Sequence, residues 1–354
     1  MTDSGMAGRA VQLVGVTKRF GEAVAVDDID LSIEPGEFVS LLGPSGCGKT
    51  TTLRMVAGFE HPDLGDVRID DRSVVGVPPH RREVTMVFQD YALFPHRTVQ
   101  QNVAFGLRMR KVAKEEISRR VDQMLELLHL TELRDRKPDQ LSGGQRQRVA
   151  LGRALVPATG VILLDEPLGA LDLKLRKRMQ LELKQIHREV GGTFIYVTHD
   201  QEEAITMSDR IAVMDRGHVL QFASAVDVYR HPATRFVAEF IGEANVLEGR
   251  VEAEGVRCGS IMVKTGATDL PVGADAIVIV RPERVRVGTA ASNAGTRFEL
   301  DVRDVVFTGP TLRILGSVGG MGLQVVTSQE ASVTAAGGTL SVGWDREDTL
   351  VLRR

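Results

Sequence analysis

The chain has 354 residues, of which 43% are hydrophobic and 26% are charged, which is ordinary for a globular protein of two or three domains. The formal net charge of -3 gives no global electrostatic case for a nucleic-acid binder. The two cysteines, Cys47 and Cys258, exclude a disulfide framework and favour a reducing cytoplasm.

The first ten residues, MTDSGMAGRA, are small and polar. They lack the apolar core of a signal peptide, so we expect a flexible tail over residues 1–10. No apolar run approaches the ~20 residues that span a bilayer. If the protein works at a membrane, another chain must do the spanning.

Strand-like and helix-like segments alternate over residues 11–240, which predicts an α/β domain with a largely parallel sheet. The apolar runs 37–43 and 160–166 end at glycine or acids, as buried central strands do. Two apolar stripes at helical spacing predict core faces, whereas the basic runs Arg108–Lys111 and Arg176–Arg178 are interpreted as solvated helix faces. The stripes comprise Ile117, Val121, Leu125 and Leu128, then Leu175, Met179, Leu183, Ile186 and Val190.

After Gly242 the pattern changes to short β-type runs separated by glycine and polar turns. No long helical stripe follows. We therefore expect a domain boundary near Ile241–Asn245 and a small all-β barrel or sandwich over residues 241–354.

The segment GPSGCGKT, Gly43–Thr50, matches the phosphate-binding pattern G-x-x-x-x-G-K-[ST] in full, between a predicted strand and a predicted helix. Its glycines allow the backbone to close around phosphate oxygens. We expect Lys49 to reach the β- and γ-phosphates of a nucleotide and the Thr50 hydroxyl to bind Mg²⁺.

Two acids, Asp165 and Glu166, end the buried run VILLDE. Alone, such a pair before Pro167 is equally consistent with an ordinary loop. Beside a phosphate-binding loop, Asp165 is a candidate Mg²⁺ ligand and Glu166 a candidate general base for the attacking water.

His199 and Gln89 also follow strand-like runs. A lone histidine is most often structural, and a lone glutamine is uninformative. At the carboxyl edge of a parallel sheet, however, His199 is able to hydrogen-bond a γ-phosphate, and Gln89 to reach Mg²⁺ or the water.

A second glycine turn, LSGGQ at Leu141–Gln145, opens another predicted helix. With the motifs in the order phosphate-binding loop, Gln89, LSGGQ, Asp165–Glu166, Ala170–Asp172 and His199, the chain resembles the nucleotide-binding subunit of an ATP-binding cassette (ABC) transporter. The resemblance implies a P-loop NTPase cassette over residues 11–240 and an ATPase that uses ATP and Mg²⁺.

In that family two cassettes pair head to tail, and each ATP lies between one subunit's phosphate-binding loop and the other's LSGGQ turn. The resemblance therefore implies a homodimer with a composite site. The nucleotide-binding residues that it implies are Phe20, Gly43, Pro44, Ser45, Gly46, Cys47, Gly48, Lys49, Thr50 and Thr51, with Ser142, Gly143, Gly144, Gln145 and Asp172 in trans. The implied metal ligands are Thr50, Gln89 and Asp165, and the implied catalytic residues are Glu166, His199, Gln89 and Lys49.

Phe20 lies where the family stacks an aromatic ring on adenine, although a core phenylalanine closing a strand is the alternative. The aromatic segment near Gln89–His96 lies where the family receives a coupling helix of a membrane permease. Core packing is the alternative for its members, Tyr91, Leu93 and Phe94, and for the nearby Phe105. The resemblance thus implies two permease subunits as partners, and a periplasmic or extracellular binding protein indirectly.

The segment Arg281–Val287, RPERVRV, resembles the accessory OB-like domain of importer ATPases, while the match around Gly309–Gly322 is loose. The amino-acid sequence of residues 77–96, 175–211 and 236–251 resembles that of the spermidine/putrescine branch of these importer ATPases. Importers of ferric iron, 2-aminoethylphosphonate or sugars share much of it and remain alternatives. The implied location is the cytoplasmic face of the plasma (inner) membrane.

Two other classes are less compatible with the sequence. Translation-type ABC ATPases fuse two cassettes and repair-type members insert a coiled coil before LSGGQ, but this chain has one phosphate-binding loop and no room for such an insertion. A regulatory scaffold without turnover is expected to lack Glu166 or His199, and both are present.

Overall fold

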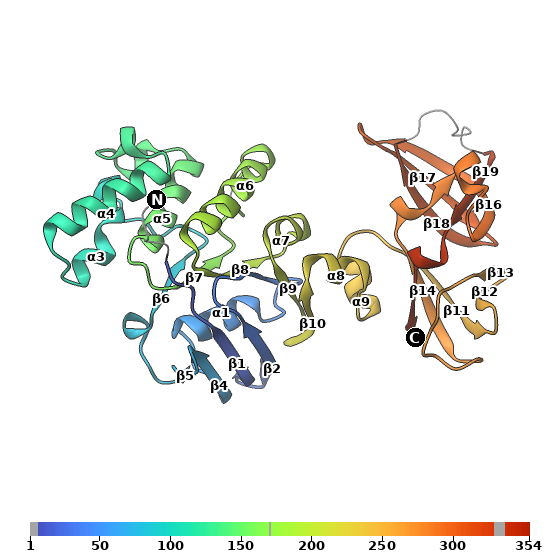
Figure 1. Ribbon diagram of the computed structural model, residues 1–354, viewed down its shortest axis with the longest axis horizontal. Helices are drawn as coiled ribbons and strands as arrows, with labels where there is room; N and C mark the ends of the chain where they lie inside the picture. The colour runs from blue at the N-terminus through green and yellow to red at the C-terminus, as the bar shows by residue number, and fades with distance from the viewer. Residues whose placement is uncertain (1–5, 170, 329–336) are drawn as a thin grey trace. The chain divides into compact units, whose positions relative to one another are not determined.

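The computed structural model describes residues 6–169, 171–328 and 337–354, and the chain divides into two compact units, Met1–Val228 and Tyr229–Arg354 (Figure 1). Ala170 of the Ala170–Asp172 motif and the first five residues of the predicted tail lie outside the described residues. The predicted domain boundary near Ile241–Asn245 differs from this division and stays a prediction.

The first unit contains a six-stranded sheet in the order β10-β9-β3-β8-β7-β6. Its strands are β3 (Phe38–Leu42), β6 (Val84–Val87), β7 (Val161–Asp165), β8 (Thr193–Thr198), β9 (Arg210–Asp215) and β10 (His218–Ser224). All neighbouring pairs are parallel except β9 with β10. The predicted, largely parallel sheet is confirmed.

An antiparallel sheet in the order β2-β1-β4-β5 accompanies it. Its strands are β1 (Val11–Phe20), β2 (Ala23–Ile33), β4 (Leu64–Ile69) and β5 (Arg72–Ser73). The helices of the unit are α1 (Lys49–Ala57), α2 (Val99–Val103), α3 (Phe105–Met109), α4 (Lys114–Leu127), α5 (Gly143–Leu155), α6 (Leu173–Val190), α7 (Gln201–Met207) and α8 (Ala225–Arg230), within which the two units divide.

The strands β3, β8 and β7 are buried on both faces, because alternate residues of each enter different apolar clusters. In β7, Ile162 and Leu164 pack with residues of α4, α5 and α6. Val161 and Leu163 pack with α1 and the antiparallel sheet. Both predicted helical stripes lie in or against the first cluster, so these core assignments are confirmed.

The second unit contains α9 (Arg235–Phe240) and two antiparallel five-stranded sheets, in the orders β13-β12-β11-β14-β20 and β15-β19-β16-β17-β18. Both sheets supply one apolar cluster around the fully buried Trp344. The predicted all-β domain is confirmed. Its strands are β11 (Asn245–Glu252), β12 (Gly255–Cys258), β13 (Ile261–Val263), β14 (Asp275–Val280), β15 (Arg286–Val287), β16 (Thr296–Phe307), β17 (Leu312–Val318), β18 (Met321–Thr327), β19 (Thr339–Trp344) and β20 (Thr349–Arg353).

Candidate functional site

Four adjacent strands of the parallel sheet carry the predicted site residues at their carboxyl ends. The loop 43–48 follows β3, His199 follows β8, Asp165 and Glu166 end β7, and Gln89 follows β6. Because the four strands are parallel and ordered β3-β8-β7-β6, all these positions share one edge of the sheet. Ligands of open α/β sheets bind at this edge.

The loop between β3 and α1 has the backbone of a phosphate cradle. A Cβ on Gly43 would lie 2.2 Å from the Met214 carbonyl oxygen, and one on Gly48 2.4 Å from that of Ala25. Gly48 also has φ of 105°, so a side chain there would add backbone strain to the clash. Gly48 begins α1 without a side-chain cap, which leaves a positive helix N-terminus in a polar turn.

Lys49 is buried at the start of α1, and its ammonium group folds back onto the loop. Nζ donates to the carbonyl oxygens of Gly43 at 2.7 Å and Pro44 at 2.8 Å. The positive charge therefore lies inside the turn that the phosphate groups of a nucleotide are expected to fill.

Asp165 and Thr50 meet at the same edge. The Thr50 hydroxyl donates to Oδ1 of Asp165 at 3.0 Å. Burial raises the pKa of the Asp165 carboxyl, against the hydrogen bond from Thr50 and the charge of Arg54. Mg²⁺ is commonly held by one or two carboxylates together with substrate phosphates and water, so this oxygen pair fits the ion.

Glu166 and His199 face each other from adjacent strand ends, with Oε2 of Glu166 3.3 Å from Nδ1 of His199. Glu166 has φ of 43°, an uncommon backbone conformation for a residue other than glycine. Its N–H donates to the Val197 carbonyl oxygen of β8 at 3.1 Å. Such strain persists where surrounding contacts enforce it, and it concentrates at functional sites. Gln89 is exposed at the end of β6.

The LSGGQ turn is on another element, the first turn of α5. Ser142 caps this helix by accepting from the Gln145 N–H, and the Gln145 side chain accepts from the Ser142 N–H at 2.9 Å. Gly144 is buried, and a Cβ there would lie 3.3 Å from the Leu175 side chain. Asp172 similarly caps α6 by accepting from the Leu175 N–H at 3.0 Å. Both turns thus have local structural roles in the single chain.

Phe20 is half exposed at the end of β1, with the Lys18 ammonium 5.3 Å from its ring centre. A core phenylalanine would be buried, so this exposure leaves the ring available for stacking on a base.

The aromatic segment after Gln89 is held by two arginines, Arg97 and Arg153, whose contacts the sequence pattern does not indicate. Arg153 donates to the carbonyl oxygens of Tyr91 and Ala92, both of which have positive φ. Its guanidinium lies 5.4 Å from the Phe94 ring centre, and that of Arg97 lies 5.1 Å from it. Sixty residues separate Arg153 from this segment, so no local pattern signals the contact.

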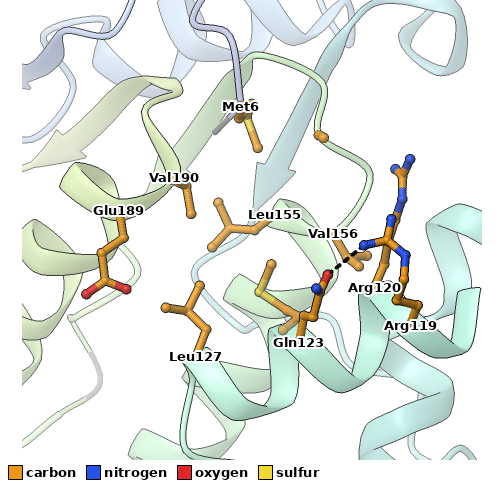
Figure 2. Close-up of a pocket in the computed structure, with 11 residues that line it drawn as sticks. Met6, Arg119, Arg120, Gln123, Leu127, Leu155, Val156, Glu189 and Val190 are labelled. Carbon is orange, nitrogen blue, oxygen red and sulfur yellow. Dashed lines mark hydrogen bonds between the residues drawn. The ribbon is translucent and has the colours of Figure 1, made fainter. Parts of the chain in front are cut away.

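A separate pocket of about 450 Å³ lies among α4, α5, α6 and Met6 (Figure 2). Met6, Leu127, Leu155 and Val190 supply apolar walls, and Gln123 hydrogen-bonds Arg119 at its rim. None of its lining residues belongs to the predicted nucleotide site.

Comparison with known proteins agrees with this geometry. Residues 26–169 match the family model "ABC transporter" and residues 278–352 match "TOBE domain". The cassette is also similar to a solved structure, the dimeric post-hydrolysis state of the ATP-binding cassette MJ0796 bound to ADP and Pi. Its TM-score is 0.54 at 34% sequence identity, over 61% of this chain and 98% of that one. The chain belongs to the family of ABC transporter ATP-binding proteins, and it is an ATPase of that class.

Several curated relatives are similar to nearly the whole chain. The chain is 54% identical to the spermidine/putrescine import ATP-binding protein PotA of Rubrobacter xylanophilus, over 97% of this chain and 93% of the relative. It is 50% identical to PotA of Thermobifida fusca over 99% and 95%, and 43% identical to PotA of Bacillus cereus over 97% and 99%. Among the helices that the structure describes, none combines the length and apolar character needed to cross a bilayer.

Proposed function

We propose that this chain is the ATP-hydrolysing subunit of an importer for spermidine and putrescine. The observation that carries the ATPase part is the convergence of Lys49, Asp165, Glu166 and His199 at the carboxyl edge of four parallel strands. The substrate part rests on near full-length similarity to relatives named for spermidine/putrescine import.

The residues of the edge divide the work of phosphoryl transfer. Lys49 exchanges its bonds to the carbonyls of Gly43 and Pro44 for bonds to the β- and γ-phosphates, where it stabilises the developing negative charge. Glu166 accepts the proton of the attacking water, and His199 donates a hydrogen bond to the γ-phosphate. Gln89 orients the water, and Phe20 stacks on the adenine.

Thr50, Asp165 and Gln89 are the residues that would hold Mg²⁺. Bound there, the ion neutralises phosphate charge. The Thr50–Asp165 hydrogen bond holds the hydroxyl and carboxyl oxygens next to each other at the start of α1.

The second cradle, Ser142–Gln145, is proposed to serve the nucleotide of a partner copy, together with Asp172. Head-to-tail pairing gives two equivalent composite sites and makes ATP part of the interface. Two of the similar solved structures are dimeric cassettes, which supports the association of two copies. The segment Gln89–His96 is proposed to receive one of two permease subunits, which places the protein peripherally at the cytoplasmic face of the inner membrane.

The test of the substrate is the ATPase activity of the complex reconstituted with its permease and binding protein in liposomes. Spermidine or putrescine is expected to stimulate hydrolysis. Stimulation by a ferric complex, 2-aminoethylphosphonate or a sugar, without a response to either polyamine, would refute the substrate and leave the importer ATPase standing.

A further inference from the structure

Arg176 lies in the first turn of α6 and turns toward the site instead of toward solvent. The basic run Arg176–Arg178 is predicted from the sequence to be a solvated helix face, and this prediction is wrong for Arg176. Its side chain is 25% exposed, against 73% for Arg178, and its Nε is fully buried. A buried guanidinium nitrogen is costly, so its surroundings need an explanation.

The guanidinium contacts the segments that follow both β7 and β8. Nη2 donates to the Leu171 carbonyl oxygen at 3.1 Å, and Nη1 donates to Oδ2 of Asp200 at 3.4 Å. Nε lies 3.9 Å from Oε1 of Glu203. A planar fork with donors in fixed directions suits such a bridge better than a lysine ammonium does.

The first contact leads back to Glu166 through short turns. The Gly169 N–H donates to the Glu166 carbonyl oxygen at 3.2 Å, and the Leu171 N–H donates to that of Leu168 at 3.2 Å. Arg176 in turn donates a hydrogen bond to the Leu171 carbonyl oxygen. Backbone hydrogen bonds made by Gly169 and Leu171 therefore lie between the strained Glu166 backbone and the guanidinium of Arg176.

The second contact leads to His199 through its neighbour, Asp200. Oδ1 of Asp200 caps α7 by accepting from the N–H groups of Glu202 and Glu203, which leaves Oδ2 for Arg176. Beneath this turn the buried Glu203 accepts from the hydroxyl groups of Tyr196 at 2.6 Å and Thr198 at 2.7 Å. The turn that carries His199 is therefore held by the hydrogen bonds of Glu203 to Tyr196 and Thr198 and by the hydrogen bond of Arg176 to Asp200.

We propose that Arg176 is a positioning residue for ATP hydrolysis, which holds the segment after Glu166 and the turn at His199 in the register that brings these two side chains together. The proposal rests on the proposed function, in which Glu166 is the general base and His199 donates a hydrogen bond to the γ-phosphate. In this proposal Arg176 acts through the two segments that it bridges, and not by direct contact with a reacting atom.

The test compares three variants of the full-length protein. Arg176→Met removes both contacts but keeps the aliphatic stem. Asp200→Asn keeps the cap on α7 and removes only the carboxylate oxygen that faces Arg176. Arg178→Met is the matched control, since Arg178 lies two residues further along α6, is largely exposed and pairs with Glu182.

Arg176→Met is expected to lower kcat by about ten- to a hundredfold, the loss that a misplacement of about 1 Å produces. KM for ATP and the affinity for a non-hydrolysable ATP analogue should change less than twofold, because the phosphate cradle is untouched. Asp200→Asn should show a smaller loss of the same kind, and Arg178→Met should match the wild type.

A double-mutant cycle separates positioning from general stability. If Arg176 acts by keeping His199 against Glu166, the single-turnover loss caused by Arg176→Met should shrink several-fold in a His199→Ala background. A full-sized loss there, an unchanged kcat, or a parallel fall of kcat and analogue affinity would each overturn the proposal. Absence of ATPase activity in the wild type would instead overturn the proposed function.

Discussion

Two long helices of the first unit begin at glycine-rich turns, and their N-termini differ in what surrounds them. At α1 the preceding residue, Gly48, provides no side-chain cap, and a buried ammonium, a hydroxyl and a carboxyl lie beside the helix end. At α5 the exposed Ser142 and its capping-box partner Gln145 satisfy the helix end locally. At α1 the buried Lys49 ammonium folds back onto the turn, whereas the cation in the first turn of α5, Arg146, is exposed.

This difference indicates why one chain carries two such turns. The α1 turn has the charge, the candidate metal-binding oxygens and the candidate base within one sheet edge, which are the groups expected to hold a nucleotide's phosphates. The α5 turn offers backbone N–H groups and a hydroxyl to a phosphate that something else must hold. In the proposed function, a partner copy that presents its own nucleotide supplies that missing part, and the following experiments test this division.

The largest effect is expected from the α1 turn. Lys49→Ala should abolish ATP hydrolysis, a loss of about a thousandfold or more, because it removes the charge that stabilises the transferred phosphoryl group. Steady-state phosphate release at saturating Mg-ATP measures it, with Lys114→Ala, at an exposed position, as a surface control. Near-normal turnover would show that the phosphate site lies elsewhere.

Glu166→Gln should bind ATP but hydrolyse it about a hundredfold more slowly, because the amide keeps the shape of the side chain and loses the base. ATP should then hold two chains together, which size-exclusion chromatography with and without ATP detects. Full activity in this variant would assign the base to another residue.

Mixed dimers test the α5 turn directly. Chains with Lys49→Ala and chains with Ser142→Arg should each be inactive alone. A mixed dimer contains one doubly damaged site and one intact site, so about half of the wild-type rate per dimer should return. If purified mixed dimers show no recovery, the Ser142 turn serves its own chain.

Much of this site is predictable from sequence because its parts are local. The spacing of Gly43, Gly48, Lys49 and Thr50 specifies a turn and a helix start, and an acidic pair after an apolar run marks a strand end. Parallel strands then bring separate strand ends to one edge without any long-range information. The core stripes of α4 and α6 follow from helical periodicity for the same reason.

Contacts made by long cationic side chains are not predictable in this way. Arg176 belongs to a run of three basic residues, and nothing in the run distinguishes the one that bridges two loops from its exposed neighbours. Arg153 meets Tyr91 and Phe94 across the fold. A guanidinium on a flexible stem takes its direction from the tertiary structure, so composition alone assigns it to the surface.

The smallest predicted effect concerns the metal-binding corner of the α1 site. Burial raises the pKa of Asp165, so the folded state binds its proton more tightly than the unfolded state does. Stability conferred by this group therefore falls as the pH rises from the ordinary aspartate range through the raised pKa, and the penalty is complete above it. Asp165→Asn removes the charge and still accepts from Thr50, so the nucleotide-free variant should unfold at a slightly higher temperature than the wild type at pH 7. This difference in unfolding temperature should become smaller as the pH is lowered toward the ordinary pKa range of aspartate.

Mg-ATP should stabilise the wild type more than the variant, because the ligand that binds the folded protein more tightly stabilises it more. Differential scanning fluorimetry with and without Mg-ATP measures both effects, and a lower unfolding temperature for the nucleotide-free variant at pH 7 would contradict a net cost of the buried charge.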